Sequence, residues 1–394
     1  DWNELEQLLD KYRQADSYDH ILYEYGLGAL YRFQGKQKKA IEMYKQIIKN
    51  NPNLHYPRFD LSMMLFEDKQ YNEAKSEFEI VRPFLPTQIQ GLIDQLLTTM
   101  KKSQDWQPTV NFNFEKTDNV NQSSNIKEIS IGDATFIRDE ESLPKKAKGL
   151  GYTLNASREK NMMSNHYAYF SATFNGINYW DNKDYSEQTI RIDTGYKYKD
   201  LKQSFGIIPF IGQNILGNSR YSNNYGTGLE YNRLLSNRLQ VSANTTHIQK
   251  RYQDSSLAQY YNGHSNSQAA LVMYQPKSQL LIYSGLDWLQ DRLADQAESS
   301  NRQGIRSGFL YFGESLGISG NIRYSQRNFL ADNIWYGIHR KDNEYELGVA
   351  AWRKQWQWKG FTPKLNYRYQ KIDSNLPLYE RNNSTFFMTI DKIF

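Results

Sequence analysis

The chain has 394 residues and no cysteine, which excludes disulfide bonds and cysteine-ligated metal sites. Its formal net charge of +5, from 48 basic and 43 acidic residues, is too small to indicate a nucleic-acid partner. Tyrosine occurs 30 times and phenylalanine 19 times, although the mean hydropathy is −0.78. Many aromatic residues in a polar chain are typical of a surface that faces lipid on one side and water on the other. No run of about 18 apolar residues occurs, so a transmembrane helix is not predicted.

Residues 1–105 show a helical period and an internal repeat. The stretch 26–52 aligns with 60–86, a spacing of 34 residues. The matching positions are Leu27 with Leu61, Tyr31 with Leu65, Ala40 with Ala74, Tyr44 with Phe78, Ile47 with Val81, and Pro52 with Pro86. The alanine lets two antiparallel helices approach, the aromatic residue fills the seam, and the proline ends the second helix. This pattern resembles the tetratricopeptide repeat and predicts a short α-solenoid.

The two repeats differ in their small residues. The first repeat has Gly28 on its first helix and Gly35 at the turn, where the second has Ser62 and Lys69. The second repeat therefore matches the pattern less closely than the first.

Two repeats alone bury little apolar surface, so we expect flanking helices near 3–14 and 87–102 to cap them. Solenoids commonly bind a peptide or protein on their concave surface, and a helical spacer is the alternative interpretation. The residues predicted to line a groove for a client protein are Leu22, Tyr25, Ala29, Arg32, Phe33, Phe59, Met63 and Phe66.

From Gln107 onward the apolar period changes to two, which indicates β-strands. Segments of about ten or more residues suit tilted strands that cross a bilayer. The predicted segments are 109–118, 149–159, 166–179, 187–199, 202–213, 223–235, 238–250, 263–275, 278–291, 302–313, 315–327, 343–355, 361–371 and 383–394. We therefore predict an α+β multidomain protein, with a periplasmic tetratricopeptide-like domain (1–105) followed by a 14-stranded antiparallel transmembrane β-barrel (106–394).

The predicted connections alternate between short and long. Short ones contain the sequences NRLLSNR, YQPKSQ, YFGESLG and QWKGFTP. Long ones are predicted near 119–148, 179–187, 213–223, 251–263, 292–301, 328–342 and 372–382. Outer-membrane barrels have tight periplasmic turns and longer extracellular loops. The chain enters the first strand from the short-turn side, so the helical repeats are predicted to lie in the periplasm.

The last predicted strand carries hydrophobic residues at alternate positions, namely Phe386, Met388, Ile390 and Phe394. We expect this strand to pair with the first one, so that no strand edge faces lipid. The pattern resembles the signal that the barrel-assembly machinery reads in outer-membrane proteins. Lys392 departs from it, because an aromatic residue often stands at that position.

An outer-membrane hydrolase is one alternative, because His264, Ser265 and Asn266 lie together in the sequence. Neighbouring residues of a strand point to opposite faces, so His264 and Ser265 are not expected to act as base and nucleophile. The six histidines are scattered without metal-ligand spacing, and no metal, cofactor or catalytic residue is predicted.

A channel for small solutes and a polymer exporter are further alternatives. A porin has no need of a protein-binding repeat domain. Polymer exporters tend to have more repeats and an arginine-rich lumen, and the sequence indicates neither.

Tetratricopeptide repeats followed by a barrel with this strand count resemble the surface lipoprotein assembly modulator family, as does the terminal Phe394. The resemblance covers essentially the whole chain. It implies a non-enzymatic outer-membrane translocon that moves lipoproteins, or related soluble haem- or metal-scavenging proteins, to the cell surface or medium. The implied partners are this client, a periplasmic chaperone, the barrel-assembly machinery and membrane lipid. Passage through the lumen and passage through a seam between the first and last strands both remain open.

Overall fold

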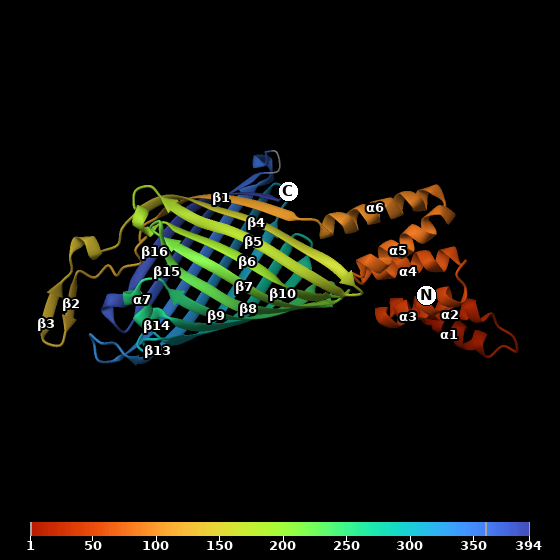
Figure 1. Cartoon of the computed structure of the whole chain (residues 1–394), viewed down its shortest axis with the longest axis horizontal. Coiled ribbons are helices and arrows are strands. Elements are labelled where there is room, and N and C mark those ends of the chain that lie inside the picture. The colour runs from red at the N-terminus through yellow and green to blue at the C-terminus, as the bar shows by residue number, and fades with distance from the viewer. Residues whose placement is uncertain (1, 359–360, 394) are drawn as a thin grey trace. The chain divides into compact units, whose positions relative to one another are not determined.

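The structure is a computed structural model that describes residues 2–358 and 361–393. Its chain forms two compact units (Figure 1). Unit 1 comprises 1–105, 158–168 and 196–204, and unit 2 comprises 106–157, 169–195 and 205–394. In the described part of the chain, every helix is too short or too polar to cross a membrane. The division into domains 1–105 and 106–394 stays a prediction.

The helices of unit 1 follow one another along the first 104 residues. They are α1 (Trp2–Arg13), α2 (His20–Phe33), α3 (Gln37–Asn50), α4 (His55–Glu67), α5 (Tyr71–Val81), the 3₁₀ turn η1 (Arg82–Phe84) and α6 (Thr87–Gln104). The pairs α2–α3 and α4–α5 confirm the two predicted repeats. Helices α1 and α6 confirm the helices predicted on either side of them.

Local sequence features explain where these helices begin and end. The Asp19 carboxylate caps α2 by accepting hydrogen bonds from the backbone N–H groups of Ile21 (2.8 Å) and Leu22 (3.1 Å). After α2 the chain turns at Gly35, with φ of +71°, and after α4 it turns at Lys69, with φ of +66°. The second turn thus has the same left-handed geometry without the glycine that favours it.

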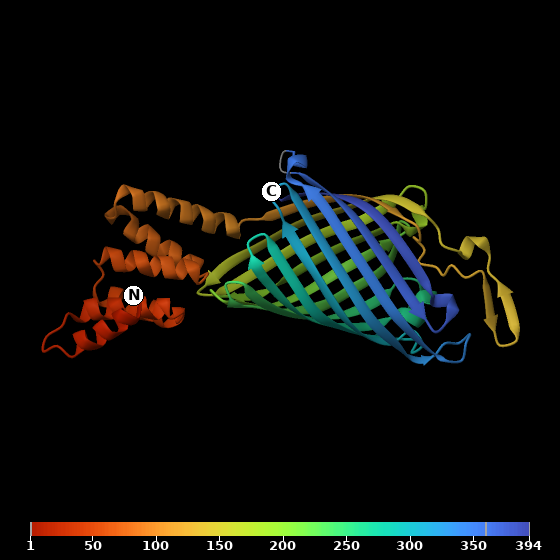
Figure 2. The same ribbon diagram turned by 180° about the vertical axis from the view of Figure 1, so that it is seen from behind.

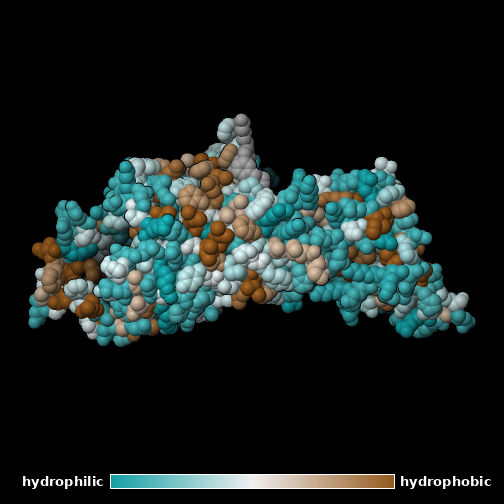
Figure 3. Space-filling model, viewed as in Figure 1, coloured by the Kyte–Doolittle hydropathy of each residue, from teal (hydrophilic) through white to brown (hydrophobic). Residues whose placement is uncertain are grey.

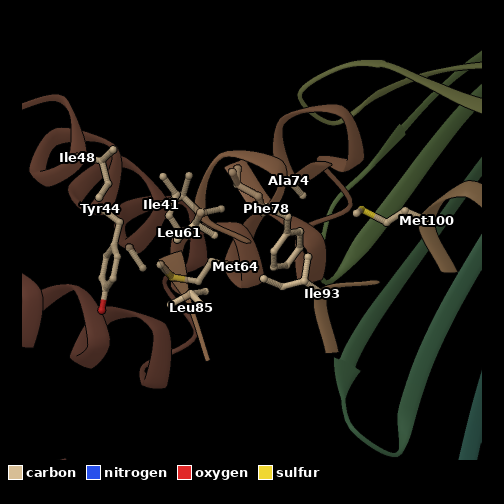
Figure 4. Packing of buried hydrophobic residues seen from close by; sticks show 13 residues of the cluster. Ile41, Tyr44, Ile48, Leu61, Met64, Ala74, Phe78, Leu85, Ile93 and Met100 are labelled. Carbon is tan, nitrogen blue, oxygen red and sulfur yellow. The ribbon is translucent and has the colours of Figure 1, made fainter. Parts of the chain in front are cut away.

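Many of the repeat positions lie in the hydrophobic core of unit 1, shown in Figure 4. Ala40 and Ala74 are fully buried, and a β-carbon on Gly28 would lie 2.4 Å from the Tyr44 ring. The small residues therefore allow the helix approach that the repeat pattern predicts. The core residues are Ala40, Ile41, Tyr44, Ile48, Leu61, Met64, Leu65, Ala74, Phe78, Val81, Leu85, Ile93 and Met100.

Fourteen strands of the described residues form one closed antiparallel barrel. They are β1 (Gln107–Thr117), β4 (Ala147–Met163), β5 (His166–Tyr179), β6 (Glu187–Lys199), β7 (Gln203–Leu216), β8 (Ser219–Ser236), β9 (Leu239–Tyr252), β10 (Gly263–Lys277), β11 (Leu280–Leu293), β12 (Ser300–Phe312), β13 (Leu316–Asp332), β14 (His339–Arg353), β15 (Thr362–Ser374) and β16 (Arg381–Ile393). Each strand pairs with its neighbour in the chain, and β1 pairs with β16 from Thr109↔Ile393 to Thr117↔Thr385. The strands coloured teal to blue stand in front in Figure 2. Closure leaves no strand edge for lipid to meet.

Each of the fourteen predicted segments corresponds to one barrel strand, and the alternation of connections holds with two exceptions. The long connection predicted at 213–223 is wrong, because β7 and β8 are joined by Gly217 and Asn218 alone. Both residues have positive φ, +53° and +67°, as a two-residue hairpin turn requires. The periplasmic connection between β14 and β15 is longer than expected and contains the 3₁₀ turn η4 (Lys354–Trp356).

The long connections carry secondary structure of their own. The β1–β4 connection contains a hairpin of β2 (Glu128–Ile131) and β3 (Ala134–Ile137), followed by η2 (Glu140–Ser142). The β9–β10 connection contains α7 (Ser255–Tyr261). The turns η3 (Lys183–Tyr185) and η5 (Pro377–Tyr379) lie in the β5–β6 and β15–β16 connections.

Candidate functional sites in the helical repeats and the barrel lumen

The predicted client-binding residues of the helices differ in how far they are exposed to solvent. Leu22 and Phe33 are 57% and 56% exposed at the two ends of α2. Phe59, Met63 and Phe66 of α4 are partly buried and pack against the core. Phe59 lies 6.1 Å from the Phe78 ring, measured between ring centroids. Leu22 and Phe33 are therefore the predicted residues that offer the most apolar surface to a partner.

Tyr25 and Arg32 connect the two repeats through their polar ends. The Tyr25 hydroxyl donates a hydrogen bond to the Asp60 carboxylate, and Arg32 forms an ion pair with Glu67. Burial, together with this hydrogen bond, raises the pKa of Tyr25 to about 12. Both side chains have a structural role in α2–α4 contact, and their predicted binding role stays a prediction.

A buried polar cluster forms around Asp68 within unit 1. The Asn165 side-chain amide donates to the Asp68 backbone oxygen (2.6 Å) and to the Lys199 backbone oxygen (2.8 Å). The backbone N–H of Leu201 donates to the Asp68 carboxylate (3.2 Å). Asp68 is almost completely buried, and these bonds give its polar groups the hydrogen-bond partners they need. They also stabilise the left-handed turn at Lys69.

Barrel strands carry apolar side chains on one face and polar side chains on the other. In the middle of β13, Ile322 is 59% exposed on the outer face, while its neighbours Asn321 and Arg323 point to the lumen. Figure 3 shows hydrophobic residues gathered on the outer surface of the barrel. An apolar outer face and a polar interior are what a barrel in a bilayer requires.

One part of the lumen, on β11 to β14, is a network of paired charges that we call the charged wall. The Asp287 carboxylate binds Arg323 (2.5 Å) and Arg302 (3.6 Å). Glu344 likewise binds Arg327 (2.7 Å) and Arg302 (3.4 Å). Each of these carboxylates thus meets two guanidinium groups, one from β12 and one from β13.

The charged wall corrects the expectation that the lumen lacks an arginine-rich surface. Strand register places Arg302 opposite Arg327 and Arg306 opposite Arg323 on the same inner face. Such rows of like charge are destabilising unless carboxylates flank them, as those of β11 and β14 do here. The sequence alone did not predict this row of arginines, because the row depends on the register between strands. Strand alternation could have shown that Arg302, Arg306, Arg323 and Arg327 all face inward.

The residues considered for hydrolysis lie on two faces of β10. The buried Ser265 hydroxyl donates to the Asp291 carboxylate, whereas His264 lies beside His247, with 5.4 Å between ring centroids. His247 in turn contacts the Asn266 side chain (2.7 Å). Ser265 is thus bonded to Asp291, which pairs with Arg327 of the charged wall (3.3 Å), and the three residues do not form a base–nucleophile pair.

A second part of the lumen, which we call the amide wall, lies on β1, β4, β5, β6, β15 and β16. It lines an open cavity of about 400 Å³, and the lining is rich in asparagine, threonine and tyrosine. Asn113 lies over Gly151 of the neighbouring strand, where a β-carbon would meet its side-chain oxygen at 2.1 Å. The absence of a side chain at Gly151 therefore gives Asn113 its place in the wall.

The predicted assembly signal lies on the outer face of β16. Phe386 is 60% exposed there, and Met388 and Ile390 follow on the same face. Phe394 lies outside the described residues. The three described residues thus present an apolar row outward, and their role in assembly stays a prediction.

Helical repeats that precede a closed barrel with an apolar exterior define an outer-membrane β-barrel protein with a periplasmic repeat domain. Comparison with known proteins gives the family. A model described as "Surface lipoprotein assembly modifier" matches residues 106–394. A second, for the N-terminal TPR repeats of the same proteins, matches residues 1–78. The chain therefore belongs to the surface lipoprotein assembly modifier family.

Individual relatives agree with the family models. A surface lipoprotein assembly modifier of Pasteurella multocida (strain Pm70) is 29% identical over 100% of this chain and 80% of its own length. The hemophilin secretion modulator of Acinetobacter baumannii is 25% identical over 98% of this chain and 82% of its own. Among solved structures, the Pseudomonas putida toluene transporter TodX has a TM-score of 0.42 and 8% identity, over 73% of this chain and 90% of its own.

Proposed function

We propose that this protein is an outer-membrane translocon that delivers specific lipoproteins, or related soluble haem- or metal-binding proteins, from the periplasm to the cell surface or medium. The observation that carries the proposal is the match of both parts of the chain to one family, with relatives named for surface lipoprotein assembly and for hemophilin secretion. The protein acts by binding and guiding its client, without a catalytic step of its own.

In this proposal the helical repeats bind the client, or a periplasmic chaperone that carries it. Support comes from Leu22 and Phe33, two large apolar side chains of α2 that are exposed. Exposed apolar side chains mark protein-binding surfaces where they form a contiguous patch, which variants of these two residues test. Folding of the client outside the cell, or its transfer from the chaperone, supplies the driving force.

Co-expression tests the proposed function directly. The protein is produced in a laboratory bacterium with a lipoprotein or haem-scavenger encoded next to its gene, and antibody labelling of intact cells measures the client at the surface. We expect labelling only when both proteins are present. A client that stays in the periplasm with and without this protein, while small solutes enter faster, would instead identify a solute channel.

A matched pair of variants tests the role of the repeats in the same assay. The double variant Leu22→Ser/Phe33→Ser removes the exposed apolar residues of α2, and we expect at least about a fivefold loss of surface client, equal to roughly 1 kcal/mol of binding. The control, Ile80→Ser/Leu92→Ser, removes exposed apolar residues of α5 and α6. Equal losses in both variants would contradict a binding surface on α2.

We further propose that the barrel-assembly machinery binds the outer row of β16. Phe386→Ser is expected to lower the amount of barrel in the outer membrane several-fold, because the signal loses its largest described side chain. The control is Phe309→Ser, which changes an exposed residue on the outer face of β12. Equal barrel levels in both variants would count against a special role of β16.

A further inference from the structure

The amide wall contains a cavity next to the place where the barrel closes. Most of its lining residues come from β1 and β16, which form the closing pair, and from the nearby strands β4, β5, β6 and β15. The others belong to the β1–β4 and β5–β6 connections. The volume of about 400 Å³ lies in the range of ligand-binding cavities. The closing pair therefore has a hollow on its luminal side, large enough to hold part of a ligand.

Neutral hydrogen-bonding groups make up most of the lining. Asn113, Asn175 and Gln370 contribute amides, each of which can donate and accept hydrogen bonds. In the described part of the chain, the side chains of Asn113 and Asn175 have no hydrogen-bond partner. A ligand with alternating donors and acceptors can bind these amides without breaking bonds inside the barrel.

Two carboxylates also face this cavity. Glu115 of β1 accepts a hydrogen bond from the Tyr179 hydroxyl (2.9 Å), and Glu187 lies at the start of β6. Neither carboxylate belongs to an ion pair among residues 2–358 and 361–393. This differs from the charged wall, where Asp287, Asp291 and Glu344 each bind two basic side chains.

One basic group, Arg368, also lines the cavity. Arg368 of β15 packs beside the Phe387 ring (5.5 Å), and its Nε is buried without a hydrogen-bond partner. Within the cavity, the rest of its guanidinium group can donate to a carbonyl or carboxylate oxygen of a ligand. The cavity lining thus combines acceptors for a cation, a donor for an anion, and neutral amides.

We propose that this cavity binds an extended polypeptide segment that carries a basic side chain. The amides match the alternating N–H and C=O groups of an extended backbone, and Glu115 and Glu187 match a lysine or arginine. A neutral saccharide could bind the amides but would leave both carboxylates without a charged partner. The inference rests on the proposed function, since it gives the transported chain a binding site within the lumen.

Peptide binding to the purified full-length protein tests the site. The probe is a fluorescein-labelled ten-residue peptide of alternating serine and lysine, and fluorescence anisotropy gives its Kd at low salt. The double variant Glu115→Gln/Glu187→Gln removes the unpaired charges with little change of shape. We expect its Kd to be about tenfold higher or more, and a serine–glutamate peptide to bind the unmodified protein more weakly than the lysine peptide.

The control variant is Glu128→Gln/Asp133→Asn, which removes the same charge from the exposed β2–β3 hairpin and should leave Kd unchanged. Circular dichroism establishes that all variants are folded. The inference is overturned if both double variants lose affinity equally, if lysine and glutamate peptides bind alike, or if maltoheptaose displaces the lysine peptide.

The same variants distinguish this inference from the proposed function. Client delivery in the co-expression assay, without carboxylate-dependent peptide binding, overturns the cavity site alone. Carboxylate-dependent peptide binding without delivery of any neighbouring client overturns the proposed function and leaves the cavity as a peptide site.

Discussion

The interior of the helical repeats and the interior of the barrel have opposite chemistry. Between the helices lie Leu65, Phe78 and other apolar side chains that are fully buried. Within the barrel lie mainly carboxylates, guanidinium groups and amides, and most of the large apolar side chains of the strands are exposed on the outside. The hydrophobic effect acts in both places, because apolar side chains move away from water toward whichever apolar medium is present.

The two parts are therefore stabilised by different interactions. The helices depend on a close-packed core, whereas the barrel depends on backbone hydrogen bonds between strands and on bonds among luminal polar groups. A charged side chain should therefore be destabilising in the helical core and tolerated in the barrel lumen.

Removing an aromatic ring from the helical core should have the largest effect. Phe78→Ala leaves a cavity in the centre of the repeats and should lower the free energy of unfolding of the helices by about 3–5 kcal/mol. Urea unfolding followed by hydrogen exchange of the α2–α5 amides measures this. Ile80→Ala, on the exposed side of the same helix, should cost far less; equal effects would show that Phe78 is not part of a close-packed core.

Adding a charge to the outer face of the barrel should have the next largest effect. Ile322→Lys places an ammonium group toward lipid in the middle of β13 and should cost about 2–4 kcal/mol. Unfolding in lipid vesicles gives the difference. Asn321→Lys adds the same charge one residue earlier, on the luminal face, and should cost less than about 1 kcal/mol. Similar costs for the two lysines would contradict the assignment of the faces.

Removing a charge from the charged wall should have a moderate effect. Asp287→Asn leaves Arg302 and Arg323 without their shared counter-ion and should cost about 1.5–3 kcal/mol, the contribution of hydrogen bonds to charged groups. Unfolding in lipid vesicles is again the measurement. Glu187→Gln in the amide wall has no ion pair to lose and should be nearly neutral. If the two variants are equally stable, the charged wall does not stabilise the barrel.

Relieving the left-handed turn after α4 should have the smallest effect, and a stabilising one. Lys69→Gly replaces a residue at φ of +66° with the residue that adopts this conformation freely, and should add roughly 0.5–1 kcal/mol. Gly35→Lys makes the reverse change in the first repeat and should destabilise it. A loss of stability in Lys69→Gly would show that the lysine side chain itself is required.

The sequence predicted both folds well, because each depends on a period that is local to the chain. The 34-residue repeat placed Ala40 and Ala74 at the helix contact, and alternation located every barrel strand. The Gly217–Asn218 hairpin was missed since its polar surroundings are typical of a loop, although both residues tolerate left-handed geometry.

The candidate sites were harder to predict, because they depend on contacts between distant residues. The period placed Tyr25 and Arg32 on one helix face, but only the structure shows their bonds to Asp60 and Glu67. In the barrel, alternation could have shown that Glu115 faces inward. Its lack of an ion pair, unlike Asp287, depends on strand register and could not be read from sequence.

The β2–β3 hairpin provides a practical means of observing the protein in living cells. Its tip, Gly132, has φ of +59°, and a β-carbon at this position would meet no atom within 4 Å, so a short insertion there would disturb little. An epitope inserted after Gly132 would lie in a loop on the extracellular side of the barrel. Antibody bound to intact cells would then count correctly inserted molecules, and would allow export measurements to be expressed per barrel.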